Sequence, residues 1–145
     1  MTATAAPKPS ADAGLFSQGR KDWSTWPAYE AAVLGFRNYW YPIDWSASIG
    51  TRPRQVTVLG EKVMLIREQG VVRALNDRCP HRGVPLSHPM SSQEFKGTWS
   101  CCYHGWTFDL KTGNLEAALT DGPDSPMRGK LHVRSYPVRV IAGLI

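Results

Sequence analysis

Two short segments of the chain bring together most of its potential metal ligands. Segment 79–83 reads C-P-H-R-G and pairs Cys79 with His81, and segment 101–106 reads C-C-Y-H-G-W and pairs Cys101 with His104. Five of the chain's seven Cys and His residues lie in these two segments. Thiolates and imidazoles are protein ligands that suit zinc and iron. The spacing therefore predicts one metal centre, held from opposite sides by two short loops.

The ligand spacing bears on which metal this centre holds. Structural zinc sites usually separate paired ligands by roughly two to four residues. Only Pro80 separates Cys79 from His81, which strains their chelation of a single tetrahedral ion. A two-iron cluster relieves this strain, because one iron takes both cysteines and the other takes both histidines, which is the Rieske arrangement. A zinc-binding module stays an alternative, and Cys102 is a further thiol that could compete as a ligand.

Composition limits the class of protein. A length of 145 residues suits one domain, and a hydrophobic content of 42% excludes a disordered chain. Three cysteines are too few for a disulfide framework, so we expect a cytoplasmic protein. No apolar run approaches the roughly 20 residues that span a membrane, and no secretory signal opens the chain. The formal charge of +5 favours an acidic protein partner, and we expect neither a nucleic-acid nor a membrane partner.

The N-terminal part is expected to differ from the rest. Residues 1–20 are rich in Ala, Pro, Ser and Thr without apolar periodicity, which predicts a disordered tail. Residues 27–37 place Tyr29, Ala32, Val33 and Phe36 on one face at helical spacing, which predicts a short helix beginning at Pro27. The folded domain is thus expected over residues 21–145.

From residue 38 onward the pattern favours β structure. Alternating and strand-forming segments predict strands at 39–41, 55–59, 62–67, 71–75, 98–101, 106–110 and 133–140. Gly60-Glu61 and Gln69-Gly70 fit two-residue hairpin turns. Together they predict a small, mostly β, antiparallel domain preceded by one short helix. The apolar run 138–145 ends without a polar cap, so we expect the chain to be the front part of a longer protein.

The two Cys-His segments resemble the cluster-binding boxes of Rieske proteins. The similarity is greatest to Rieske non-haem iron oxygenases, the terminal components of aromatic ring-hydroxylating systems. FRNYWYP at 36–42 and SYPV at 135–138 are also similar to the N-terminal domains of this family, so the resemblance covers roughly residues 33–145. It implies a Rieske-type β-sandwich with the cluster-binding loops at its tip. It also implies one [2Fe-2S] cluster, with Cys79 and Cys101 on one iron and His81 and His104 on the other.

The resemblance further implies which residues surround the cluster. These residues are Arg82, Gly83, Tyr103, Gly105 and Trp106. The glycines allow tight loops, and Trp106 is expected to shield the cluster from water.

Three positions differ from the Rieske proteins of cytochrome complexes. Those proteins carry an extra cysteine in each box, joined as a disulfide, and a serine whose hydroxyl bonds the cluster. Here the corresponding residues are Val84, Tyr103 and Trp106. Because fewer hydrogen bonds to the sulfurs make reduction harder, we predict a potential at the low end of the Rieske range of about −150 to +300 mV.

The histidine count limits what the chain does alone. After His81 and His104 are used, only His88 and His132 remain, 44 residues apart, and no motif of two histidines and a carboxylate contains them. The resemblance therefore implies an electron-transfer domain of a mono- or dioxygenase that is inactive alone, with the mononuclear Fe(II) in a missing C-terminal part.

The resemblance also implies partners. They are a ferredoxin or reductase as electron donor, the protein's own catalytic domain, and a neighbouring subunit of a homo-oligomer. The implied pathway is the catabolism of aromatic hydrocarbons, with the flanking segments most similar to oxygenases of carbazole-like and other polycyclic or heteroaromatic compounds. A free-standing Rieske ferredoxin, which carries electrons without enzyme activity, stays an alternative.

Overall fold

A computed structural model describes residue 27 and residues 35–145. The predicted tail and residues 28–34 of the predicted helix lie outside the described residues. The described end of that segment is a 3-10 helix, η2 (Gly35–Asn38). The chain divides into two units, Met1–Tyr39 and Trp40–Ile145, and every strand described below belongs to the second. No helix in the described part of the chain is long and apolar enough to cross a membrane.

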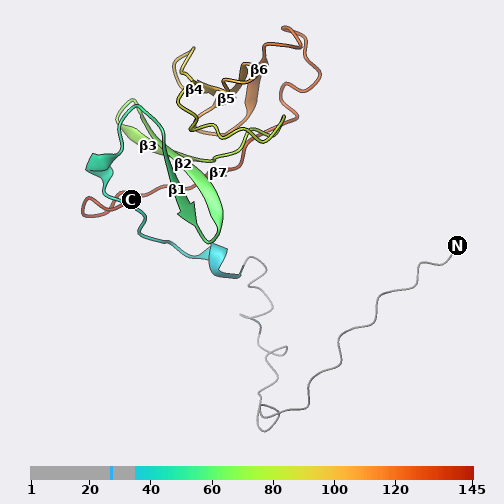
Figure 1. The fold of residues 1–145 in the computed structure, drawn as a ribbon. Helices are drawn as coiled ribbons and strands as arrows, with labels where there is room; N and C mark the ends of the chain where they lie inside the picture. The colour runs from blue at the N-terminus through green and yellow to red at the C-terminus, as the bar shows by residue number, and fades with distance from the viewer. Residues whose placement is uncertain (1–26, 28–34) are drawn as a thin grey trace, which may run out of the picture. The chain divides into compact units, whose positions relative to one another are not determined.

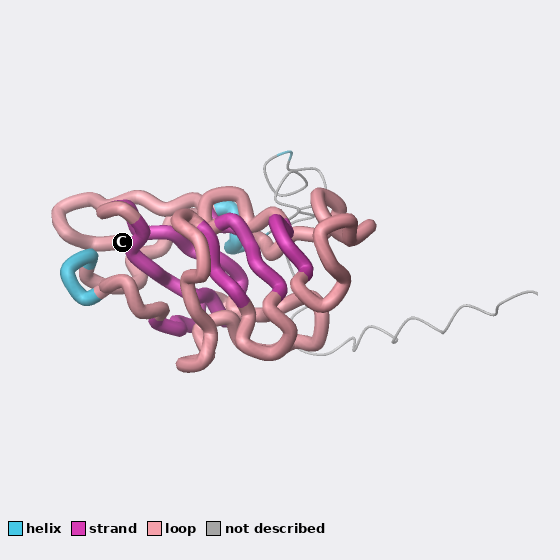
Figure 2. The backbone as a smooth tube through the Cα atoms, turned by 90° about the horizontal axis from the view of Figure 1, so that it is seen from above, coloured by secondary structure: helices cyan, strands magenta, loops and turns pink. Residues whose placement is uncertain are grey.

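The second unit contains two small antiparallel sheets (Figure 1, Figure 2). The first sheet has the order β1-β2-β3-β7 and the second has the order β4-β5-β6. Their bounds are β1 (Arg54–Val58), β2 (Glu61–Glu68), β3 (Val71–Asn76), β4 (Thr98–Ser100), β5 (Trp106–Asp109), β6 (Leu115–Ala118) and β7 (Ser135–Tyr136). A second 3-10 helix, η3 (Ser46–Ser48), precedes β1. The predicted mostly β, antiparallel fold is confirmed.

Two tight turns connect the first three strands. Leu59 and Gly60 join β1 to β2 with φ of 48° and 80°, and Gln69 and Gly70 join β2 to β3 with φ of 50° and 80°. Positive φ at both central residues marks turns whose twist matches that of the flanking strands. The predicted Gly60-Glu61 turn is wrong by one residue, because Glu61 already pairs with Val58 in the ladder.

The first of these turns offers a simple test of the fold. Leu59 holds a left-handed conformation that asparagine adopts more readily than leucine, and its side chain is 43% exposed. We expect Leu59→Asn to raise the free energy of unfolding by about 0.5 kcal/mol, measured by urea denaturation. Leu119→Asn is the control, because Leu119 is also exposed but its φ is not positive. A stability gain of equal size at both positions would contradict this explanation.

Three strand predictions need correction. Residues 39–41 form no strand, and Tyr39 and Trp40 are more than half exposed. The predicted strand 133–140 shortens to β7, because Pro137 lacks the N–H needed to continue the ladder. Strand β6 was not predicted, since its sequence Leu-Glu-Ala-Ala consists of residues that favour helices. Pairing with β5 overrides that local preference.

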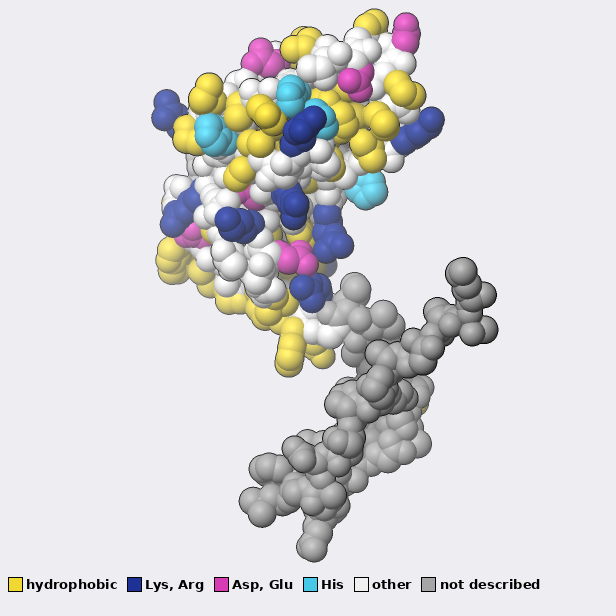
Figure 3. Space-filling view, turned by 45° about the vertical axis from the view of Figure 1, so that its right-hand side comes forward, with side chains coloured by type: hydrophobic (Ala, Val, Ile, Leu, Met, Phe, Trp, Pro, Cys, Tyr) yellow, Lys and Arg dark blue, Asp and Glu magenta, His cyan; other side chains and the backbone are white. Residues whose placement is uncertain are grey.

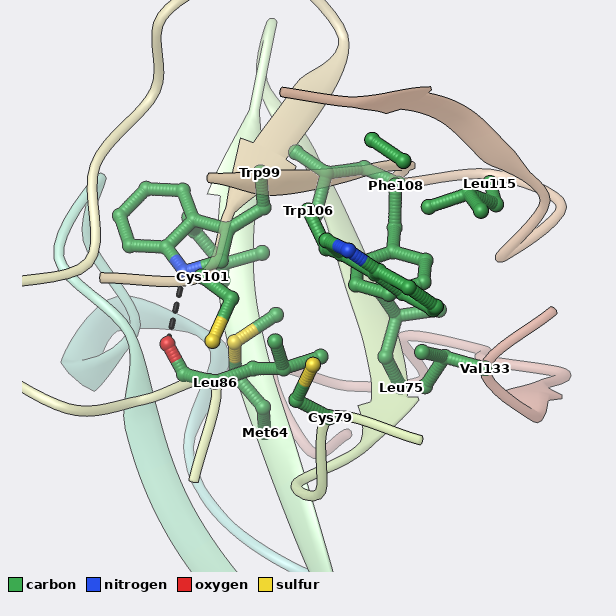
Figure 4. Packing of buried hydrophobic residues seen from close by; sticks show 13 residues of the cluster. Met64, Leu75, Cys79, Leu86, Trp99, Cys101, Trp106, Phe108, Leu115 and Val133 are labelled. Carbon is green, nitrogen blue, oxygen red and sulfur yellow. Dashed lines mark hydrogen bonds between the residues drawn. The ribbon is translucent and has the colours of Figure 1, made fainter. Parts of the chain in front are cut away.

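The core explains how the sheets position the Cys-His segments. Strand β2 buries four consecutive residues, 63–66, whose side chains alternate between two clusters. One cluster contains Val63 and Leu65, together with Ile49, Val72 and Ala74. The other contains Met64 and Ile66 and side chains of both sheets, including Trp99, Trp106 and Phe108 (Figure 4). Cys79 and Cys101 belong to this second cluster, so the core that joins the sheets also holds both cysteines.

Candidate metal centre

The first Cys-His loop, residues 79–84, closes on its own cysteine. The Cys79 N–H donates to the Val84 carbonyl at 2.8 Å, and the Gly83 N–H donates to the Cys79 carbonyl at 2.8 Å. Gly83 has a φ of 76°, a conformation that residues with a Cβ rarely adopt. The loop begins three residues after the last residue of β3, so the first sheet determines where it begins.

The second Cys-His loop, residues 101–106, repeats this hydrogen-bond pattern between β4 and β5. The Cys101 N–H donates to the Trp106 carbonyl at 2.8 Å, and the Gly105 N–H donates to the Cys101 carbonyl at 3.0 Å. Gly105 also has a positive φ, 63°. The two loops therefore have the same backbone hydrogen-bond pattern, with cysteine at the first position and glycine at the fifth. They differ in the position of the histidine, which is third in one loop and fourth in the other.

Gly105 is needed for space as well as for its backbone conformation. A Cβ at Gly105 would lie 2.8–2.9 Å from Leu119 side-chain atoms, whereas a Cβ at Gly97, with φ of 80°, would meet nothing within 4 Å. We expect Gly97→Ala to lower the free energy of unfolding by about 1 kcal/mol, through backbone strain alone. Gly105→Ala adds a steric clash and is expected to lower it by about 3 kcal/mol. Equal losses in thermal or urea unfolding would show that Leu119 does not restrict the loop.

The fold brings the four predicted ligands together as two pairs. The rings of His81 and His104 are 4.7 Å apart between centroids, with an interplanar angle of 56°. The Cys79 and Cys101 side chains are buried, with 2% and 3% of their surface exposed. Both histidines are only half-buried. The thiol pair thus lies on the core side of the site, and the imidazole pair lies nearer the surface.

The Cys79 thiol is held in an environment that disfavours its thiolate form. Burial raises the pKa of the Cys79 thiol to about 11, with the amide N–H groups of His81 and Arg82 acting against this and the adjacent Cys101 thiol adding to it. A coordinated metal cation removes the proton of such a thiol outright. The buried Cys79 thiol beside the Cys101 thiol is therefore suited to binding a metal.

One atom of the imidazole pair lacks a partner. His104 Nδ1 is buried and finds no hydrogen-bond partner among the described residues. Unpaired buried polar atoms are rare in native proteins and call for a specific explanation, such as a missing ion. Coordination of a metal by this nitrogen would satisfy it.

Aromatic side chains cover both imidazoles. The Trp106 ring stacks on His81 at 4.6 Å between centroids with an interplanar angle of 7°, and the Tyr103 ring lies 4.0 Å from that of His104. Trp106 is 5% exposed and Tyr103 is 56% exposed. Figure 3 shows histidine side chains among hydrophobic ones at the end of the domain drawn uppermost. The buried Trp106 indole thus covers the site on the core side, and the exposed Tyr103 ring lies on its solvent side.

Comparison with known proteins decides which family this geometry belongs to. The family model of the Rieske [2Fe-2S] domain matches residues 39–137. The chain belongs to this family. The predicted resemblance is confirmed, and with it the presence of a Rieske [2Fe-2S] domain in the chain.

Relatives and solved structures agree with this assignment. The Rieske domain is similar to the terminal oxygenase component of carbazole 1,9a-dioxygenase from Sphingomonas sp, at 45% identity over 83% of this chain and 32% of the relative. It is also similar to the oxygenase subunit of 3-chlorobenzoate-3,4-dioxygenase from Comamonas testosteroni, at 34% identity over 75% and 25% of the two chains.

Solved structures show the same fold. The terminal oxygenase of carbazole 1,9a-dioxygenase from Novosphingobium sp. KA1 superposes with a TM-score of 0.71 at 46% identity, over 84% of this chain and 32% of that one. The oxygenase in a reduced complex with ferredoxin, also of carbazole 1,9a-dioxygenase, superposes with a TM-score of 0.71 at 38% identity, over 84% and 31%. The chain spans about a third of the length of these relatives.

The residues of the Rieske domain fit a [2Fe-2S] cluster. Thiolates and imidazoles suit iron–sulfur chemistry, and the unpaired nitrogen of His104 needs a ligand. Among the described residues, no three His, Cys, Asp or Glu side chains converge so as to hold one metal ion. The thiol pair and the imidazole pair match the two-Cys, two-His ligand set of a Rieske cluster.

The remaining predicted candidates lie outside these pairs. Cys102 Sγ lies 3.5 Å from His88 Nδ1, and the same nitrogen accepts a hydrogen bond from the Met90 N–H at 3.2 Å. His132 lies opposite Asn114 in an isolated β-bridge. Among the other predicted neighbours of the cluster, the Arg82 side chain is exposed and Gly83 packs near Arg78.

Sequence reasoning missed a carboxylate that supports the first Cys-His loop. Asp77 is 2% exposed, and its carboxylate accepts the Ser87 N–H at 2.7 Å and the Ser87 hydroxyl at 2.6 Å. It also accepts a hydrogen bond from the Gln55 amide of β1. Asp77 and Ser87 stand on the two sides of the loop, so this contact ties its ends together. The available signal was an aspartate at the end of a strand, two residues before Cys79.

Proposed function

We propose that Cys79 and Cys101 bind one iron of the [2Fe-2S] cluster and that His81 and His104 bind the other. The observation that carries this proposal is the buried, unpaired Nδ1 of His104 beside a second imidazole, with two buried thiols behind them. A cluster held in this way accepts and releases one electron. The protein contributes the tight loops, the buried thiols and the aromatic cover.

We further propose that the domain transfers electrons from a ferredoxin to the mononuclear iron of an aromatic-ring oxygenase. Support comes from the relatives, which are oxygenase components of dioxygenases, and from the solved structure of a carbazole 1,9a-dioxygenase oxygenase in complex with ferredoxin. The accepting iron is proposed to lie in the protein's own catalytic domain or in a neighbouring subunit of a homo-oligomer. An aromatic heterocycle is the proposed substrate class, because two of the relatives act on carbazole.

The burial of the four ligands suggests the route of the electron. The imidazole pair is half-buried whereas the thiol pair is enclosed in the core, so His81 and His104 offer the shortest path to the surface. Leu119, which is 77% exposed, lies against the second loop at Gly105. An exposed apolar rim on a basic protein suits brief contact with an acidic redox partner. We also propose a cytoplasmic location, since a chain with three cysteines, two of them proposed iron ligands, has no disulfide framework.

Metal analysis and reduction kinetics test the proposed function. The chain, produced in iron-replete cells and purified without oxygen, is expected to contain two iron and two sulfide per chain and to be red-brown. Stoichiometric zinc without iron would overturn it. Reduction by a ferredoxin is expected to slow as ionic strength rises, because charge attraction that guides the encounter is screened. A rate that is independent of salt would contradict docking by charge.

A further inference from the structure

The indole N–H of Trp106 is the second buried polar group that lacks a partner. Among the described residues that are not exposed, only His104 Nδ1 and Trp106 Nε1 are fully buried side-chain nitrogens or oxygens without a hydrogen bond. The proposed coordination of iron accounts for the His104 Nδ1 atom. An indole nitrogen only donates hydrogen bonds and never binds metal in its neutral form, so the second requires an acceptor. Because buried donors are nearly always paired, an acceptor is expected beside Trp106.

The position of Trp106 limits where this acceptor lies. The side chain is 5% exposed, so bulk water does not reach the N–H. Its ring lies parallel to that of the proposed ligand His81, and it belongs to the same buried cluster as Cys79 and Cys101 (Figure 4). A metal bound to an imidazole lies in the plane of that ring. An indole stacked on His81 therefore lies next to the other ligands of an iron bound to His81, which include the cluster sulfurs.

We infer that the Trp106 indole N–H donates a hydrogen bond to a sulfur atom of the [2Fe-2S] cluster and thereby raises its reduction potential above that of a cluster without this bond. This corrects the expectation that replacing serine by Trp106 leaves the position without a hydrogen bond to sulfur. The inference rests on the proposed function, because the acceptor exists only when the four ligands hold the cluster. Cluster sulfurs carry negative charge that increases on reduction. A hydrogen bond to sulfur therefore stabilises the reduced state more than the oxidised one, and such bonds tune iron–sulfur potentials.

The chain contains a matched control in Trp99. It is also 5% exposed and belongs to the same buried cluster, on strand β4 next to β5. Its indole N–H is already paired, since it donates to the Leu86 carbonyl at 2.7 Å. Trp99→Phe thus removes a buried indole N–H whose acceptor is known and is part of the protein. Loss of packing affects both variants, whereas only Trp106→Phe removes a bond to sulfur.

The experiment measures the midpoint potential of the full chain and of both variants. Trp106→Phe is expected to make reduction about tenfold less favourable, a fall of about 59 mV for one electron. Trp99→Phe is expected to leave the potential unchanged. In unaltered protein labelled with ¹⁵N in tryptophan, the reduced cluster is expected to show a hyperfine coupling to one indole nitrogen and to its exchangeable proton. Both couplings should disappear in Trp106→Phe and persist in Trp99→Phe.

The outcomes separate this inference from the proposed function. An assembled cluster with unchanged potential in Trp106→Phe overturns the hydrogen bond and leaves the ligand set standing. Should that variant fail to assemble a cluster, the labelled unaltered protein decides, and the absence of an indole coupling overturns the inference. Unaltered protein that binds no iron–sulfur cluster would instead refute the proposed function itself.

Discussion

Replacing Cys101 by alanine will abolish cluster binding, whereas the same replacement of the adjacent Cys102 will leave the cluster in place. Cys101 is 3% exposed and interacts with the Cys79 thiol, so its loss would remove one of the two proposed ligands of one iron. Cys102 is half-buried and contacts His88. Protein thiolates are the ligands of a Cys-bound iron, and the other thiol of the loop, Cys102, contacts His88, so we expect no group of the loop to replace Cys101.

Iron and acid-labile sulfide per chain measure this effect, together with visible circular dichroism. We expect Cys101→Ala to fall to about a tenth of the unaltered content or less, and Cys102→Ala to stay within the error of the unaltered protein. The pair is well matched, since the two cysteines are neighbours in one loop. Retention of the cluster in Cys101→Ala together with its loss in Cys102→Ala would reassign the ligand to Cys102.

Replacing Asp77 by alanine is expected to destabilise the domain and to weaken cluster binding. The Asp77 carboxylate is buried and accepts two hydrogen bonds from Ser87 and one from Gln55. Alanine would leave the two donors of the half-buried Ser87 without their acceptor, whereas the exposed Gln55 amide can pair with water, and each unpaired buried donor costs roughly 1–3 kcal/mol. We expect a loss of about 3 kcal/mol or more in the free energy of unfolding. Replacing a residue that orients a metal ligand typically lowers metal affinity by about 10–100-fold. We therefore also expect the variant to lose iron to a chelator about tenfold faster.

Asp109→Ala provides the control for Asp77→Ala. The Asp109 carboxylate likewise accepts a backbone N–H and a hydroxyl from one residue, Thr112, at 2.6 and 2.7 Å. These bonds close the turn after β5, outside both Cys-His loops, and they are exposed. We expect a stability loss of about 1 kcal/mol and an unchanged rate of iron loss. Equal rates of iron loss in the two aspartate variants would show that Asp77 supports the fold without positioning the loop.

Local sequence signals predicted many of the strands and turns. Turn residues with glycine identified the hairpins of β1, β2 and β3, and alternation identified β1, because these signals depend only on neighbours along the chain. The failures occurred where distant pairing decides. The helix-favouring residues 115–118 become β6 only because β5 offers them hydrogen bonds. The stretch 39–41 has strand-forming residues but no strand of the described part pairs with it.

The sequence by itself was enough to propose the ligand types and the loop that carries each of them. A cysteine and a histidine within four residues must share one loop, and the spacing of both boxes was sufficient to identify a Rieske domain. Only the tertiary structure decided how the loops combine. It placed the thiols in the core and the imidazoles toward the surface, and it tied Asp77 to Ser87. It also left the Trp106 N–H buried without a partner. Burial and side-chain pairing arise where two sheets pack together, and spacing along one chain segment does not encode that contact.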